Sequence, residues 1–205
     1  MNKDIPVISL QRLPVYLNYL KSLSGSERKT ISSGAIAADL GLGEVLVRKD
    51  LAYTSAVGRP RVGYDVDELI SAIEEFLTCK NLKNAVIAGV GGLGRAILGY
   101  GGFSNYGIEI VAAADSDKSK AGSVILGKPV YSPTDIRGVI EEKQVKLAVL
   151  CVPAYAAQQV AETLISYGIV GILNFAPAQI KTPEGVTVIN IDVAANLAIL
   201  SSMIF

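Results

Sequence analysis

The chain of 205 residues has no net charge, with 19 basic against 19 acidic side chains, and half of its residues are apolar. This composition is typical of a globular protein, and it excludes a disordered chain and a surface that is basic all over. The absence of histidine removes the commonest general base and zinc ligand, and two cysteines are too few for a disulfide framework.

No apolar run is long enough to cross a bilayer, and the first residues lack the basic and apolar sections of a secretion signal. We therefore expect a protein of the cytoplasm, with neither a membrane nor a metal among its partners. Because the net charge is zero, any nucleic-acid site must be a local basic patch.

From Leu10 to about Cys79 the sequence has the periodicity of helices. Four leucines repeat at helical spacing, namely Leu10, Leu13, Leu17 and Leu20. Within that run Pro14 predicts a kink or the start of the regular helix, and Ser24–Ser26 predicts its end. Three further helices are predicted at Ser33–Leu40, Glu44–Thr54 and Asp67–Leu77.

The helices Ser33–Leu40 and Glu44–Thr54, joined by a glycine-bearing turn, have the proportions of a helix–turn–helix. On the second helix, Val47 and Leu51 are expected to face inward. The opposite side then carries Val45, Arg48, Lys49 and Ala52. A recognition helix needs this arrangement, because cationic and small side chains must reach a DNA groove while the other face is anchored.

The loop Val57–Tyr64 carries Arg59 and Arg61 and contains two glycines. A winged-helix domain uses such a wing to contact the minor groove or phosphates. We therefore expect DNA to be bound by Arg48, Lys49, Arg59 and Arg61. The alternative interpretation is an ordinary solvated helix and loop, since surface pairs of basic residues are common.

From about residue 81 the pattern changes to short apolar strands that alternate with helices. The strands are predicted at Ala85–Ala88, Ile108–Ala114, Lys128–Tyr131, Leu147–Val152, Gly171–Phe175 and Val186–Ile191. The helices are predicted at Gly94–Tyr100, Thr134–Lys143 and Ala154–Tyr167. This alternation predicts a mostly parallel sheet that is covered on both faces.

A glycine motif, G-x-G-x-x-G, follows the first of these strands at Gly89, Gly91 and Gly94. The three glycines would allow a tight turn, the close approach of a pyrophosphate and tight helix–strand packing, in that order. Asp115 ends the next strand, 21 residues after Gly94. A carboxylate there accepts hydrogen bonds from a ribose diol and repels a 2′-phosphate, which favours NAD over NADP. A plain βα turn with a solvated strand-end carboxylate is the alternative.

The tail from Val193 to Phe205 contains no charged residue. It is too short to cross a membrane, and a helix that is apolar nearly all round needs burial. Insertion into a second subunit would provide that burial, and packing against its own domain is the alternative.

Several further motifs accompany these features: Arg12-Leu13-Pro14 with Tyr16, Val47-Arg48-Lys49-Asp50-Leu51 with Tyr53, Val62-Gly63-Tyr64, Tyr100 with Gly102-Phe103, Val152-Pro153, Gly171-Ile172-Leu173-Asn174-Phe175-Ala176-Pro177 and Asn190-Ile191-Asp192. In this order, and together with the glycine motif, they make the chain resemble the Rex family of redox-sensing transcriptional repressors over nearly its whole length. Two departures are Pro60-Arg61, where the family's wing usually has Arg-Gly, and Gly92, where relatives often have a basic residue.

The resemblance implies an α/β protein with a winged helix–turn–helix at residues 1–80 and a doubly wound Rossmann domain at 81–191. Residues 192–205 would form a dimerisation helix that is exchanged between the two subunits of a homodimer. Members of the family bind operator DNA when NAD⁺ prevails and are released when NADH binds. The resemblance therefore implies a regulator with NAD(H) as cofactor and no catalytic residues.

The resemblance also implies roles for particular residues. Asp115 would hold the adenosine ribose, and Tyr53 would join the DNA contacts. Tyr100 and Asp192 match a pair that exchanges partners in the switch, and Arg12 matches a residue that pairs with the aspartate across the dimer when DNA is bound. The expected cofactor-binding residues are Gly89, Gly91, Gly92, Leu93, Gly94, Tyr100, Asp115, Val152, Pro153, Asn174, Phe175, Ala176 and Pro177.

Two other functions fit part of this pattern. An NAD-dependent oxidoreductase would bind its cofactor with the same glycine motif and Asp115. Hydride transfer usually needs a positioned acid–base group, however, and the spacing of residues in this sequence does not identify one. A CoA-binding module of the succinyl-CoA ligase type has a similar Rossmann half. Asp115 favours a dinucleotide over CoA, and such a module would leave the winged helix unexplained.

Overall fold

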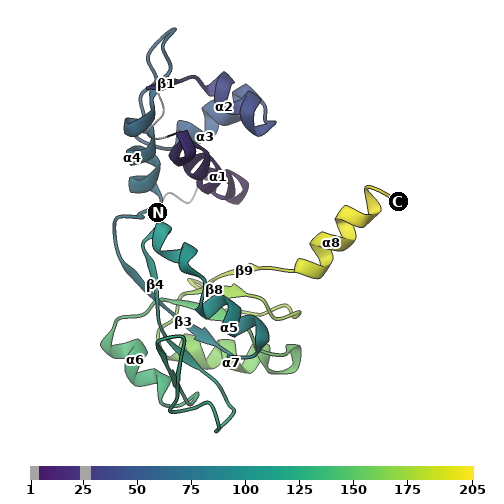
Figure 1. The fold of residues 1–205 in the computed structure, drawn as a ribbon. Coiled ribbons are helices and arrows are strands. Elements are labelled where there is room, and N and C mark those ends of the chain that lie inside the picture. The colour runs from purple at the N-terminus through teal and green to yellow at the C-terminus, as the bar shows by residue number, and fades with distance from the viewer. Residues whose placement is uncertain (1–4, 24–28) are drawn as a thin grey trace. The chain divides into compact units, whose positions relative to one another are not determined.

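A computed structural model describes residues 5–23 and 29–205, so the helix end expected at 24–26 lies outside the described residues. The chain divides into two compact units, residues 1–81 and 82–205 (Figure 1). The domain boundary predicted after residue 80 therefore differs by one residue from the division seen here.

The N-terminal unit is a small helical domain closed by a two-stranded sheet. Its elements are α1 (Val7–Leu23), β1 (Thr30–Ile31), α2 (Ser33–Leu40), α3 (Glu44–Leu51), β2 (Tyr64–Asp65) and α4 (Val66–Phe76). Each helix buries one apolar stripe in a shared core, to which α1 contributes Leu13, Tyr16, Leu17 and Leu20. An ion pair of 2.7 Å between Lys21 and Glu74 joins α1 to α4 at the surface.

Side-chain and glycine caps determine where these helices begin and end. The Ser32 hydroxyl accepts a hydrogen bond from the Ala35 amide at the start of α2, and Gly41 ends that helix in the left-handed conformation. Helix α3 ends at Leu51 and is shorter than predicted, because the amides of Tyr53 and Thr54 donate to carbonyls three residues earlier instead of four. Helix α1 begins before Pro14 and runs through it, so the interpretation of Pro14 as a helix start is wrong.

Strands β1 and β2 pair antiparallel, with Ile31 opposite Tyr64, and the loop before β2 forms the wing. An isolated bridge between Arg59 and Gly63 closes the tip of this loop. Gly63 has φ +93°, and a Cβ there would lie 2.4 Å from the Ile31 carbonyl oxygen. Only glycine fits at this position, because both the backbone conformation and the space exclude a side chain.

The C-terminal unit is built on one seven-stranded sheet in the order β5-β6-β4-β3-β7-β8-β9. The strands are β3 (Lys83–Ala88), β4 (Ile108–Ala114), β5 (Val124–Ile125), β6 (Lys128–Tyr131), β7 (Leu147–Leu150), β8 (Gly171–Asn174) and β9 (Thr187–Asn190). The helices are α5 (Gly92–Leu98), the 3₁₀ helix η1 (Gly101–Tyr106), α6 (Ile136–Glu142), α7 (Ala154–Ser166) and α8 (Val193–Ser202). All pairings are parallel except that of the edge strand β5.

Helices cover both faces of this sheet. Residues of α6 and α7 pack with β3, β4 and β7 in one apolar cluster, and residues of α5 and η1 pack in a second cluster. The predicted α/β class, with a winged helix followed by a doubly wound parallel sheet, is confirmed. The strand order reverses between β3 and β7, and ligands of such sheets bind outside the carboxyl ends of the strands at this switch point.

Candidate functional site

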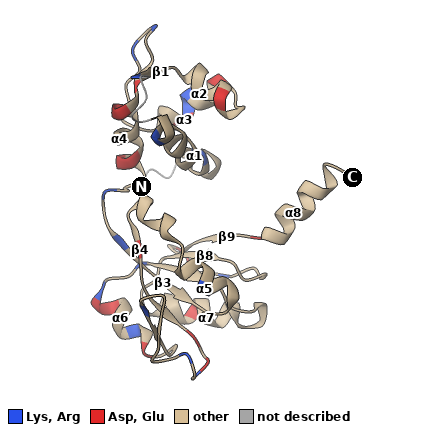
Figure 2. Ribbon diagram, viewed as in Figure 1, with Lys and Arg blue, Asp and Glu red and all other residues tan. Residues whose placement is uncertain are grey.

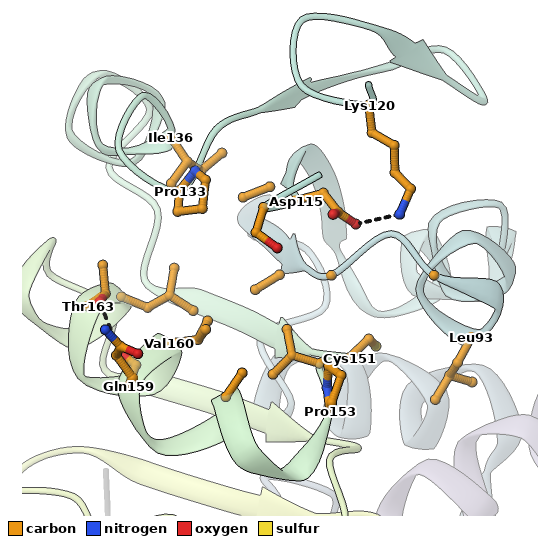
Figure 3. Close-up of a pocket in the computed structure, with 18 of the residues that line it drawn as sticks. Leu93, Asp115, Lys120, Pro133, Ile136, Cys151, Pro153, Gln159, Val160 and Thr163 are labelled. Carbon is orange, nitrogen blue, oxygen red and sulfur yellow. Dashed lines mark hydrogen bonds and ion pairs between the residues drawn. The ribbon is translucent and has the colours of Figure 1, made fainter. Parts of the chain in front are cut away.

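A cavity of about 790 Å³ lies at this switch point, at the carboxyl ends of β3, β4 and β7 (Figure 3). Its walls include seven of the residues predicted to bind the cofactor, namely Gly89, Gly91, Gly92, Leu93, Asp115, Val152 and Pro153. These residues come from the segments that follow β3, β4 and β7, and two of them, Gly92 and Leu93, are the first residues of α5. The parallel sheet brings them together because the strand ends that precede these segments lie at one edge.

The three motif glycines have different surroundings. Gly89 has φ +92°, and a Cβ on it would lie 2.4 Å from the Cys151 carbonyl oxygen. A Cβ on Gly94 would lie 1.9 Å from the Gly89 carbonyl oxygen, so Gly94 allows α5 to start directly against the turn. A Cβ on Gly91 would meet nothing within 4 Å. The bare backbone at Gly91 is therefore not required by packing, and it leaves open space beside the cavity for a ligand.

Asp115 lies at the end of β4, beside the glycine loop. Its Oδ2 accepts a 2.8 Å hydrogen bond from the Val90 amide, and its Oδ1 accepts one of 2.9 Å from the Asp117 amide. Lys120 Nζ lies 3.2 Å from Oδ2. Burial alone would raise the pKa of Asp115, but the two amides and Lys120 outweigh it and hold the pKa below its usual value. The carboxylate is thus charged, and it lies in the wall of the cavity beside Lys120 (Figure 3).

Several cavity residues were not predicted from the sequence. Ser116 and Lys120 follow Asp115, Pro133 and Ile136 follow β6, and one face of α7 supplies Tyr155, Ala156, Gln159, Val160, Thr163 and Leu164. Only a weak indication of the residues on α7 was present in the sequence. The helix predicted at residues 154–167 starts directly after Val152-Pro153, so its first turns had to lie near the cofactor site.

The remaining predicted cofactor residues do not line this cavity. Asn174 is buried at the end of β8, where its amide nitrogen donates to the carbonyl oxygens of Ala176 and Ala178 and to the side-chain oxygen of Asn190. Phe175 is half-buried and Pro177 is exposed. Asn174 therefore shapes the turn that carries these residues, and their contact with a cofactor stays a prediction.

Tyr100 belongs to a different hollow. Tyr100 is 64% exposed, and its ring meets that of Phe103 edge to face, with 5.4 Å between the centroids. It lies with Leu126 and Lys128 around a shallow hollow of about 550 Å³ beside β4. Asp192, its predicted partner in the switch, caps α8 by accepting a 2.8 Å hydrogen bond from the Ala195 amide.

The residues present fit the adenosine and pyrophosphate parts of a dinucleotide. Open space at Gly91 and the free amides at the start of α5 suit a pyrophosphate, which a helix N-terminus attracts. The charged carboxylate of Asp115 suits a ribose diol. The apolar wall of Pro133, Ile136 and Val160 offers a flat nucleobase a surface on which to pack.

The N-terminal unit presents a second candidate site on α3. Val47 and Leu51 are fully buried, as predicted, whereas Arg48 and Lys49 are exposed on the opposite side. Tyr53, just beyond the helix, is 39% exposed. Arg59 and Arg61 are exposed in the wing, where Figure 2 shows basic residues near the end of the loop between α3 and β2. The structure thus leaves all five predicted DNA-binding side chains accessible.

A buried ion pair that was not predicted from the sequence holds α3 on α1. Asp50 is 1% exposed, and its two oxygens accept hydrogen bonds from Arg12 Nε at 2.6 Å and Nη2 at 2.8 Å. The Tyr16 hydroxyl donates a third bond of 2.7 Å. Burial would raise the pKa of Asp50, but the hydrogen bonds from Arg12, Tyr16 and Ser9 lower it overall. A sequence signal existed, because Asp50 follows Val47 by three residues on the inward face of the helix.

Helix α8 buries none of its residues, although it carries no charge (Figure 2). Its exposed large side chains, with those just after it, are Val193, Leu197, Ile199, Leu200, Met203, Ile204 and Phe205. An apolar surface of this size on one helix is unusual for a monomer in water and is typical of a protein–protein contact.

Within residues 5–23 and 29–205, no group of cysteine, aspartate and glutamate side chains could hold a metal ion. No helix there is both long and apolar enough to cross a membrane.

Two protein families match parts of the chain. Residues 4–52 match the family described as "Putative DNA-binding protein N-terminus", and residues 80–178 match "CoA binding domain". The first match covers α1 to α3 and ends at residue 52. The second covers the sheet from β3 to β8 and begins close to the division between the two units.

Relatives align with nearly the whole chain. The protein named "Redox-sensing transcriptional repressor Rex" from Treponema denticola is 40% identical over 195 residues, which are 95% of this chain and 93% of that protein. The proteins of the same name from Streptomyces coelicolor and Bacillus subtilis are 38% and 36% identical, covering 98% and 96% of this chain and 78% and 92% of those proteins.

Solved structures of RSP, described as a Rex-family repressor, have the same fold. The complex of RSP with β-NAD⁺ and operator DNA matches with a TM-score of 0.93 at 28% identity, over 99% of this chain and 94% of that one. The complex with β-NADH matches with a TM-score of 0.87, over 99% and 95% of the two chains.

Proposed function

The chain belongs to the Rex family of redox-sensing transcriptional repressors, and on this premise we propose that it binds operator DNA when NAD⁺ prevails and leaves it when NADH binds. The observation that carries the proposal is that one chain holds both a dinucleotide cradle at the switch point of its sheet and an accessible basic helix in its winged domain. A protein that acts on operator DNA works where the chromosome is, so we also propose a cytoplasmic location.

The cofactor is NAD(H), and this chain holds its adenosine and pyrophosphate portions with residues of the cavity. Gly89, Gly91 and Gly92 bring backbone to the pyrophosphate, Asp115 accepts from the ribose hydroxyls, and Leu93, Val152 and Pro153 form the adjoining wall. Gly94 acts indirectly, by allowing α5 to begin at the turn. We further propose that Tyr100, Asn174, Phe175, Ala176 and Pro177 form the nicotinamide side.

The oxidised nicotinamide ring is cationic and the reduced ring is neutral, and the two cofactors share every other group. A response to redox state must therefore arise where the protein meets that ring. Phe175 and Pro177 offer the nicotinamide ring an apolar surface. A neutral ring packs on such a surface at a lower desolvation cost than a cationic ring does. A coupling of about 1–3 kcal/mol between cofactor and DNA sites suffices for a switch.

DNA is bound by α3 and the wing. We propose that Arg48 and Lys49 enter the major groove, that Tyr53 contacts the duplex beside them, and that Arg59 and Arg61 contact the minor groove or phosphates. Arg61 is exposed beside Pro60, in place of the family's usual Arg-Gly, so its reach along the wing differs from that of relatives.

The DNA contacts can be tested by salt dependence. Each phosphate contact contributes about 0.9 to the slope of log affinity against log salt concentration. We expect Arg61→Ala to flatten the slope by about that amount in a fluorescence-anisotropy titration at several salt concentrations. Arg137→Ala, in the other unit, is the matched control, and an unchanged slope for Arg61→Ala would exclude Arg61 from contact with phosphate.

We propose that the chain works as a homodimer in which residues 192–205 form the dimerisation helix. The support is that α8 is uncharged and wholly exposed in the single chain. In that dimer Asp192 would face Tyr100 in one state and Arg12 in the other, as in the family pattern. Deletion of residues 193–205 should convert a dimer to a monomer in sedimentation velocity at micromolar concentration, and a full-length monomer there would contradict the proposal.

The family is named for regulation, and we propose that this chain likewise has no catalytic activity. A steady-state assay of NADH oxidation with candidate carbonyl substrates checks this, and turnover would favour the oxidoreductase alternative. The match to the family "CoA binding domain" makes CoA the second ligand to test. Tight binding of CoA with weak binding of NADH would favour a ligase-like module.

The decisive experiment tests the cofactor site, the DNA site and the coupling between them together. Operator duplexes are selected from a random pool with NAD⁺ present, and their binding is then followed by gel shift as NADH is added. We expect release by NADH and opposition by NAD⁺. Duplex binding that is unaffected by either nucleotide would overturn the sensor function, even if each ligand bound separately.

A further inference from the structure

The outward stripe of α3 is not purely basic. At helical spacing it consists of Val45, Arg48, Lys49 and Ala52, all exposed. Val45 lies one turn before the two cations, and it is 55% exposed although it is apolar and β-branched. The opposite stripe is fully buried at Val47 and Leu51. An aliphatic side chain therefore stands in the same row as the cations that we place in the groove.

Neither acidic residue of α3 weakens this stripe. Asp50 is buried and is neutralised by Arg12. Glu44, at the first position of the helix, faces the start of α2, where the Ser33 hydroxyl lies 3.5 Å from its carboxylate. The row that begins at Val45 thus presents two positive charges and two apolar side chains, of which Val45 is the larger. Such a row is complementary to a polyanion that carries an apolar group close to its charges.

Duplex DNA offers one such group in its major groove, the C5-methyl of thymine. We propose that Val45 packs on a thymine methyl in each operator half-site and so specifies a T·A pair there, beside the contacts made by Arg48 and Lys49. This inference rests on the proposed function, because it needs α3 to enter the major groove. It adds a specificity-determining residue that reads a base by apolar contact.

Replacing thymine by uracil removes the methyl group and leaves every hydrogen bond of the base pair in place. The duplex selected from the random pool is therefore scanned with single dT-to-dU replacements, and affinity is measured in the presence of NAD⁺. Burial of one methyl group corresponds to about a fourfold change in affinity. We expect a loss of about this size at one thymine of each half-site and smaller effects at other thymines.

The Val45→Ala variant identifies the protein side of the contact. We expect it to bind the thymine duplex severalfold more weakly and to lose its response to uracil at that one position only. Because Val45 is exposed, Val45→Ala should unfold at the same temperature as the wild type. Val124→Ala, on the edge strand β5 and 68% exposed, is the matched control and should respond to uracil as the wild type does.

A wild-type protein that is indifferent to uracil at every position overturns the inference, as does a Val45→Ala variant that keeps the full wild-type response. In both cases release by NADH would leave the proposed function standing. Failure to bind any selected duplex would instead overturn the proposed function, and this inference with it.

Discussion

Arg12 on α1 and Asp50 on α3 form a two-bond ion pair, with Nε–Oδ2 at 2.6 Å and Nη2–Oδ1 at 2.8 Å. Asp50 lies on the same helix as Arg48 and Lys49 but points the opposite way, into the core. The pair therefore determines how firmly the DNA-facing stripe of α3 is held against the rest of its domain. It also gives Arg12 a partner within its own chain, in addition to the aspartate proposed across the dimer.

Removing one member of this pair should destabilise the N-terminal unit strongly. Arg12→Ala leaves the Asp50 carboxylate buried without its cation, a change that typically lowers the free energy of unfolding by about 3 kcal/mol or more. Urea unfolding followed by circular dichroism checks this through the transition of the helical unit. Arg137→Ala removes an exposed i,i+4 pair with Glu141 and should have a far smaller effect. Equal effects of the two substitutions would contradict the conclusion that the buried ion pair of Arg12 and Asp50 stabilises the N-terminal unit.

Tyr16, whose hydroxyl donates a hydrogen bond to Asp50, should make the stability of the N-terminal unit depend on pH in the alkaline range. Burial, and then the hydrogen bond to Asp50, raises the pKa of Tyr16 to about 12. Because the folded-state pKa lies above the unfolded value of about 10, the contribution of Tyr16 is complete below pH 10. It is lost as the pH rises from about 10 to about 12.

The comparison with Tyr16→Phe isolates this effect from other groups that titrate in the same range. The difference in unfolding free energy between wild type and Tyr16→Phe should shrink as the pH rises above 10. A difference that stays constant to pH 12 would show that the Tyr16 pKa is not raised. Tyr155→Phe, on an exposed tyrosine of the other unit, serves as the control.

Substitution by alanine at two glycines of the same motif should change two different properties, the stability of the C-terminal unit and its affinity for NADH. A Cβ on Gly94 would overlap the Gly89 carbonyl oxygen, so Gly94→Ala should lower the unfolding temperature of the C-terminal unit. A Cβ on Gly91 meets no atom of the protein, so Gly91→Ala should fold normally and bind NADH more weakly. Calorimetric unfolding and isothermal titration with NADH separate the two effects. Normal NADH affinity in Gly91→Ala would remove Gly91 from the pyrophosphate site.

Asp115 and Lys120 should influence cofactor choice in opposite directions. Asp115→Asn removes the charge that repels a 2′-phosphate, so the preference for NADH over NADPH should narrow. Lys120→Met removes the cation 3.2 Å from that carboxylate, so discrimination against NADPH should widen. Isothermal titration of both nucleotides with both variants measures this. The same change of preference in both variants would mean that Lys120 does not act through Asp115.

Local patterns in the sequence determined much of this fold. Three elements have the predicted bounds, namely the strands Ile108–Ala114 and Lys128–Tyr131 and the helix Ser33–Leu40. Each could be located because the residues of the segment alone carry the pattern that indicates it. The glycine motif could likewise be located, since its function depends on close spacing. The two-residue strand β5 and the helix η1 were not predicted, because neither is long enough to show a period.

What only the tertiary structure decided were relationships between residues far apart in the chain. Arg12 meets Asp50 across 38 positions, and the amide of Val90 reaches Asp115 across 25. Tyr155, Gln159 and Thr163 became cavity residues because α7 packs against β7 and lines the same cavity as the turns that follow β3 and β4, which no local pattern reveals. Periodicity records which face of an element is apolar. Which other element covers that face, and which polar atoms meet there, depends on packing the whole chain around its cores.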